Sequence, residues 1–130
     1  MKNVYQFELT DEDSLVVVDC KIRHHNFALA LDTGASHTVI DLTALLLIGF
    51  TMRDVTRLVQ LETGKGVVDA FVFNLSMFSS LGKTVENMEI CSYDFIGNAI
   101  FSDFDGVLGL DFFKGSHLDI DFRNYRISLQ

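Results

Sequence analysis

The sequence predicts a mostly β fold with two short helices. Strand-like alternation and β-branched runs recur along the chain, glycine or polar residues separate them, and two segments have a helical pattern. The chain has 130 residues, of which 48% are hydrophobic, so it can bury a real core. We expect one domain over residues 1–130, because the sequence shows no linker, low-complexity segment or fixed-period repeat.

The expected strands follow one another in hairpins. A polar turn at Thr10–Asp13 should follow the first strand, and a polar corner at Arg23–Asn26 should join the next two. Glycines at Thr63–Gly66 and a turn at Leu81–Gly82 should close two more hairpins, and the last should turn at Arg123–Asn124. The strands are expected over residues 4–9, 14–20, 21–31, 56–62, 67–76, 83–93, 117–122 and 125–129.

Two helices are expected. The better one is Asp41–Gly49, where Asp41 can cap the first turn and Gly49 can end the last. It is short and apolar, so we expect it in the core. The second is Leu110–Lys114, which should end near Gly115.

The stretch from Leu29 to Ile40 carries the main candidate site. Its apolar residues lead directly into Asp32, and a carboxylate inside an apolar segment is costly unless it has a partner or a function. Gly34 allows a sharp turn, and Thr38–Ile40 resumes a β-branched pattern. We predict a strand, a tight turn that carries Asp32, and a second strand.

Asp32 suits a reaction that needs two carboxylates. Two such groups held close share one proton, so that one acts as general base on a water and the other as general acid. The chain has one Asp-Thr-Gly, and its nearest second copy, Asp103–Gly106, lacks the threonine. The pair would therefore come from two chains related by a two-fold axis.

Two motifs resemble those of the retropepsin-like aspartic proteases. Asp32–Ser36 is similar to the active-site loop of that family, and Asp105–Phe112 is similar to its second signature, in the form carried by cellular and bacterial single-domain members. The resemblance covers Asp19–Gln130. It implies a closed single-domain β-barrel with a flap hairpin, and a homodimeric aspartic endopeptidase that uses no metal or cofactor.

The resemblance also implies roles for individual residues. Asp32 would be catalytic, Thr33 would point into the dimer interface, and Gly34 would offer its backbone to the substrate. Retroviral members have an arginine braced against an acidic residue at the places held here by Leu110 and Ser36, so that brace is absent. The substrate-binding residues implied are Ala30, Ala35, Ser36, His37, Val39, Val107 and the flap residues Thr63, Gly64, Lys65 and Gly66.

Composition excludes several other classes of function. A net charge of −8 argues against nucleic acid and anionic membranes as partners, and no apolar run has the length of a membrane span. The first residues lack a signal-peptide core. Cys20 and Cys91 are only two and lack a metal-type spacing, so we interpret them as reduced core thiols of a cytoplasmic protein, with a disulfide as the alternative.

Two other functions fit parts of the sequence. The same fold could serve as a dimeric peptide-binding or scaffolding module with little or no turnover, since fold does not imply function. A metallohydrolase would need a set of metal ligands, but the four histidines do not share a ligand spacing. Those histidines are His24, His25, His37 and His117.

Overall fold

The computed structural model describes residues 3–9, 15–64, 66–95, 97 and 103–130. The expectation of a mostly β chain with two short α-helices is confirmed. The strands are β1 (Asn3–Gln6), β2 (Val17–Ile22), β3 (His25–Leu31), β4 (Val39–Asp41), β5 (Val55–Thr63), β6 (Gly66–Ser80), β7 (Lys83–Tyr93), β8 (Gly106–Leu108), β9 (Leu118–Asp121) and β10 (Arg126–Leu129). The helices are α1 (Leu42–Leu47), the 3₁₀ turn η1 (Met52–Asp54) and α2 (Leu110–Phe113).

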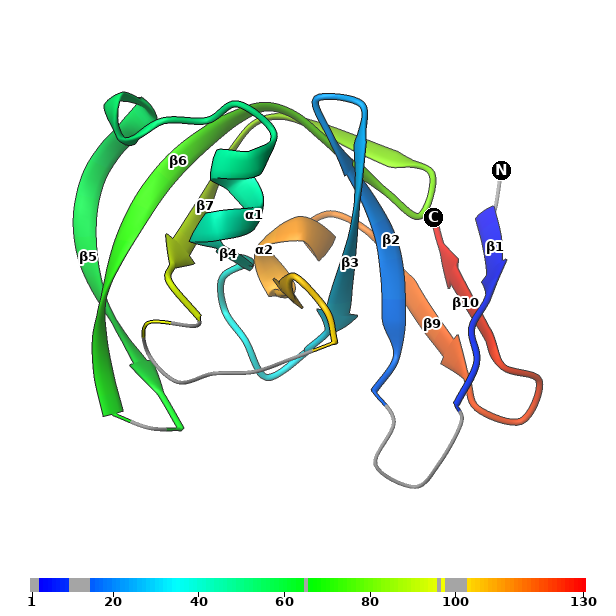
Figure 1. Ribbon diagram of the computed structural model, residues 1–130. Coiled ribbons are helices and arrows are strands. Elements are labelled where there is room, and N and C mark those ends of the chain that lie inside the picture. The colour runs from blue at the N-terminus through cyan, green and yellow to red at the C-terminus, as the bar shows by residue number, and fades with distance from the viewer. Residues whose placement is uncertain (1–2, 10–14, 65, 96, 98–102) are drawn as a thin grey trace.

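The larger sheet closes on itself to form a six-stranded barrel. Its strands run in the order β2-β3-β8-β4-β7-β6, and β6 returns to pair with β2, where Cys20–Ile22 lies opposite Phe78–Ser80. β5 lies outside this ring and, within the described residues, pairs with β6 alone. The long hairpin of β5 and β6 therefore forms one side of the molecule (Figure 1).

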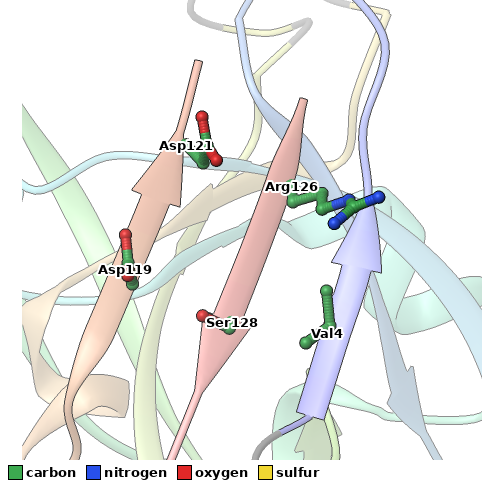
Figure 2. A pocket seen from close by; sticks show the side chains of 5 residues that line it. All are labelled: Val4, Asp119, Asp121, Arg126 and Ser128. Atoms are coloured by element: carbon green, nitrogen blue, oxygen red, sulfur yellow. The ribbon is translucent and has the colours of Figure 1, made fainter. Parts of the chain in front are cut away.

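Strands from the two ends of the chain form a second, three-stranded sheet. Its order is β1-β10-β9, all antiparallel, and it lies on the side of the barrel away from β5 (Figure 1). Ile127 and Leu129 on β10 are buried and belong to the main core. The opposite face, shown in Figure 2, carries Val4, Asp119, Asp121, Arg126 and Ser128.

The barrel interior is filled mainly by aromatic and branched side chains. Phe78 and Phe112 meet edge to face with ring centroids 5.3 Å apart, which joins α2 to the barrel. Lys83 fixes the end of the same helix, because its Nζ donates to the carbonyl oxygens of Phe112 at 2.7 Å and Lys114 at 3.1 Å. A smaller apolar cluster, built around Ala70, Tyr93 and Phe95, lies apart from this core.

Tight turns explain why the hairpins close where they do. Arg23 and His24 between β2 and β3, and Leu81 and Gly82 between β6 and β7, all have positive φ. Two consecutive positive φ values are those of a type I′ turn, whose twist matches that of a hairpin. In the described part of the chain, neither helix has the length and apolarity needed to cross a lipid bilayer.

Several local predictions need correction. Asp41 does not cap α1 through its side chain; its Oδ1 instead accepts a hydrogen bond from the backbone N of Phe95 at 3.1 Å. α1 is not wholly core, because Leu47 is 81% exposed while Leu45 is fully buried. The first strand ends at Gln6 rather than residue 9, since its partner β10 begins at Arg126.

The other expected strands are present. β7 has the predicted range, and each of the other strands begins or ends at a different residue from the predicted one. The predicted polar turn at Thr10–Asp13 lies outside the described residues. Cys20 and Cys91 are free and buried, as predicted.

Candidate active site

Asp32 lies on a tight turn at the end of β3. Its backbone N donates to the carbonyl oxygen of Leu108 at 3.0 Å, and its own carbonyl oxygen accepts from the backbone N of Ala35 at 3.1 Å. The carboxylate oxygen Oδ1 accepts from the backbone N of Gly34 at 2.9 Å. The Asp32 side chain is otherwise exposed, so the turn presents a carboxylate to solvent from a buried strand.

The second signature passes directly beneath this turn. β8 pairs in parallel with β3 and antiparallel with β4, so it lies between the two strands that flank Asp32. Gly106 is required by this close approach, because a Cβ there would overlap the carbonyl oxygen of Val39. Asp105 precedes it, and its Oδ2 accepts from the backbone N of Ala28 at 2.9 Å. Asp105 therefore fastens β3 and does not supply a second carboxylate beside Asp32.

A cavity of about 480 Å³ opens above the Asp32 turn. It lies between that turn, the end of the hairpin of β5 and β6, and the segment that follows β7. Its wall is largely apolar. The lining residues are Asp32, Gly34, Ala35, Ser36, His37, Val39, Leu61, Glu62, Thr63, Tyr93, Phe95, Phe104 and Val107.

Aromatic side chains form one wall of this pocket. The rings of Tyr93 and Phe95 are 4.8 Å apart and tilted by 41°. Burial, together with the charge of Asp41, raises the pKa of Tyr93 above its usual value, so this side chain is neutral at physiological pH. The wall therefore suits apolar groups.

Most of the residues implied by the resemblance come together here. Six of the predicted substrate-binding residues line the pocket with Asp32 and Gly34: Ala35, Ser36, His37, Val39, Thr63 and Val107. Ser36 Oγ lies 2.9 Å from Nδ1 of His37, within hydrogen-bonding distance.

The remaining predicted residues lie elsewhere. Ala30 is buried at 2% exposure between β2 and β8, and it does not line the pocket. Thr33 is exposed on the turn. Gly64 and Gly66 are at the tip of the hairpin, beyond the lining residues, and Lys65 lies outside the described residues.

Sequence reasoning missed five lining residues: Leu61, Glu62, Tyr93, Phe95 and Phe104. Alternation along β5 could have identified Leu61 as facing inward, since Val59 and Leu61 are more buried than their neighbours. Tyr93 and Phe95 reach the pocket because β7 pairs with β4, the strand that follows the Asp32 turn. Phe104 lies just before β8, which pairs with β3 and β4. These pairings are not local, so no short motif signals them.

We also considered the two cysteine thiols and possible metal ligands as reactive groups. Burial raises the pKa of Cys20 to about 12 and also raises the pKa of Cys91, so neither thiol forms a thiolate readily. The described residues hold no group of three or more His, Cys, Asp or Glu side chains placed to bind a metal ion.

The barrel is closed, and a pocket separates the turn that carries Asp32 from the hairpin of β5 and β6. This is the architecture of an aspartic protease. A sequence model of the aspartyl protease family matches residues 18–112, so the chain belongs to that family. The chain is also similar to a solved retropepsin-like aspartic protease from Rickettsia conorii. The two are 16% identical over 98% of each chain, with a TM-score of 0.70, which shows that the retropepsin-like fold is shared. A search of curated proteins gave no significant match.

Proposed function

We propose that this protein is an aspartic endopeptidase that acts as a homodimer, with Asp32 from each copy forming the catalytic pair. The position of Asp32 carries the proposal. It lies in the one Asp-Thr-Gly of the chain, at the floor of an apolar pocket and opposite a covering hairpin. Asp105 belongs to the segment that most resembles a second Asp-Thr-Gly, but its carboxylate already accepts a hydrogen bond from the backbone N of Ala28. This favours a second chain as the source of the other carboxylate.

The two carboxylates would share one proton. Like charge at short range prevents both from ionising, so one stays protonated and the other is charged. The charged Asp32 takes a proton from a water, which attacks the peptide carbonyl carbon, while the protonated one donates to the carbonyl oxygen. A proton then passes to the leaving nitrogen as the C–N bond breaks. The reaction needs neither metal nor cofactor, because the pair supplies both acid and base.

The substrate in this proposal is an extended peptide. It would lie between the Asp32 turn and the hairpin, where strand-like backbone hydrogen bonds can hold it. Ser36 and His37 would contact its main chain, and Val39, Val107 and the aromatic wall would take apolar side chains. Thr33 would bond the turn of the partner copy. Two free, buried thiols support a reducing compartment such as the cytoplasm.

The test compares wild type with Asp32→Asn on a peptide library. Turnover should fall by about 10²- to 10⁴-fold, because a carboxamide cannot act as a base, while the fold and dimer persist. Wild-type turnover in the purified variant would overturn the proposal.

Dilution tests the requirement for two chains. Specific activity should fall as protein is diluted below the dimer dissociation constant, since each copy carries half of the site. Sedimentation on the same samples gives the oligomeric state. Constant activity in a monomeric sample would exclude the shared pair, and peptide binding without hydrolysis would favour a scaffolding module.

A further inference from the structure

A partly buried hydrogen-bond network joins the Asp32 turn to the start of α2. Asp111 on α2 accepts at Oδ2 from the backbone N of Thr38 at 2.9 Å, and at Oδ1 from Thr38 Oγ1 at 2.7 Å. Thr38 is fully buried and lies at the end of the turn, immediately before β4. A carboxylate thus binds both donors of one residue that is 73 positions away in the sequence.

Further bonds extend this network to both sides of the turn. Thr38 Oγ1 accepts from the backbone N of Gly109 at 3.1 Å. The next residue, Leu110, donates its backbone N to the carbonyl oxygen of Ala35 at 2.8 Å. The turn is therefore bonded to the short segment 109–111 at two places: at Ala35 in the middle of the turn and at Thr38 at its end.

Each partner of the Asp111 carboxylate is a donor. Besides the two groups of Thr38, the backbone N of Phe112 donates to Oδ1 at 2.9 Å. A carboxylate can accept all three, whereas an asparagine would place an NH₂ group against one of these donors. The three donors therefore match a carboxylate better than a carboxamide.

Leu110 holds the place of the retroviral arginine but cannot act as a brace, because its side chain is apolar and 46% exposed. The side-chain bonds to the turn come instead from the residue that follows it, Asp111. We infer that Asp111, acting through Thr38, is a positioning residue that sets the orientation of the catalytic turn, an inference that rests on the proposed function. Its loss should affect turnover more than substrate binding, since small displacements of a reacting group cost rate steeply.

The experiment uses Asp111→Asn and the pair Thr38→Val and Thr38→Ser. Asp111→Asn and Thr38→Val should lower kcat by roughly ten- to a hundredfold with KM little changed. Thr38→Ser, which restores the hydroxyl, should recover most of the kcat lost in Thr38→Val. Asp119→Asn, on the outer face of the terminal sheet, is the matched control for removing one negative charge.

Hydrogen exchange measures the network without any need for activity. Protection of the Leu110 amide, which is bonded to Ala35, should fall by at least about tenfold in Asp111→Asn and stay unchanged in Asp119→Asn. Unchanged exchange and wild-type kcat in a folded Asp111→Asn would overturn the inference. Unfolding of both Asp111→Asn and Thr38→Val would also overturn it, in favour of a purely structural role.

The two proposals fail in different ways. If wild type and Asp32→Asn both lack turnover, the proposed function fails, while the exchange measurement still decides whether Asp111 holds the turn. If wild type is active and the Asp111 and Thr38 variants match it, the positioning role alone fails.

Discussion

The turn of residues 32–38 and the hairpin of β5 and β6 face each other across the pocket, but they are held in different ways. The turn is bonded from beneath to β8 through Asp32 and Leu108, and to the segment 109–111 through Ala35 and Thr38. Near its tip, where Val59–Thr63 pairs with Gly66–Ala70, the hairpin is bonded along its own ladder, because β6 pairs with β7 only from Phe71 onward. β5 is a sheet edge within the described residues.

The side chains behind the turn and those behind the hairpin tip are also packed differently. The main core beneath the turn contains fully buried side chains such as Leu29, Ile40 and Leu108. The cluster on the hairpin side has Ala70, Tyr93 and Phe95 as its buried members and is completed by partly buried Val39, Val59, Leu61 and Val68. Local opening costs least where few apolar groups are buried, so we expect the tip of the hairpin to open more readily than the turn. That division is what the proposed function requires, because a peptide must enter without displacing Asp32.

Among variants that compare the turn with the hairpin, Gly109→Ala, which crowds the space beneath the turn, should have the largest effect. A Cβ at Gly109 would lie 2.6 Å from the backbone of His37 and 2.8 Å from the carbonyl oxygen of Ala35. Overpacking of this kind lowers the free energy of unfolding by about 1–3 kcal/mol. Turnover should fall by about a hundredfold because the turn is displaced. Denaturant titration and kcat measure the two effects, and a variant with wild-type values would show that the turn is not rigid.

The hairpin should respond to Gly66→Val mainly in turnover. Gly66 has φ +111°, which an L residue adopts only with strain of about 1–3 kcal/mol, and the strain is confined to the tip. We expect turnover to fall by at least about tenfold with only a modest change in Tm. Gly64→Val is the matched control, since a Cβ at either glycine meets nothing within 4 Å and Gly64 lacks the positive φ. Wild-type kinetics in Gly66→Val would mean that this hairpin does not cover the site.

A smaller effect is expected from Ala35→Ser, which adds a hydroxyl beside Asp32 in the pocket. A donor to the ionised pair stabilises the charged form, so the profile of kcat/KM against pH should move to lower pH. The shift should be about one unit or less, because one hydrogen bond contributes about 1 kcal/mol. A profile that stays in place or moves upward would show that this hydroxyl does not reach the pair.

The smallest effect should come from the outer side of the hairpin. Arg57 NH1 and Glu89 Oε2 are 2.7 Å apart, with both side chains more than half exposed. A double-mutant cycle with Arg57→Ala and Glu89→Ala should give a coupling of less than about 1 kcal/mol. A larger coupling would show that β5 is held more firmly than its edge position indicates.

Local patterns predicted much of the fold. The turn at Leu81–Gly82 located the start of β7, whose range matches the prediction, and the glycines at Thr63–Gly66 located the tip of the hairpin of β5 and β6. Alternation and turn composition are set by near neighbours, so they are readable without knowing the fold. The same patterns failed at Asp41, whose carboxylate bonds to Phe95 rather than capping α1. A partner 54 residues away decided that bond, and no local rule could supply it.

The sequence by itself determined the character of the site: a carboxylate on a tight turn after an apolar strand, in a chain with one Asp-Thr-Gly. Only the tertiary structure decided what surrounds it. β8 pairs between β3 and β4, which brings Asp111 under the turn. β7 pairs with β4, which brings Tyr93 into the pocket. Such pairings depend on barrel closure and the packing of distant side chains, which a periodic pattern does not record.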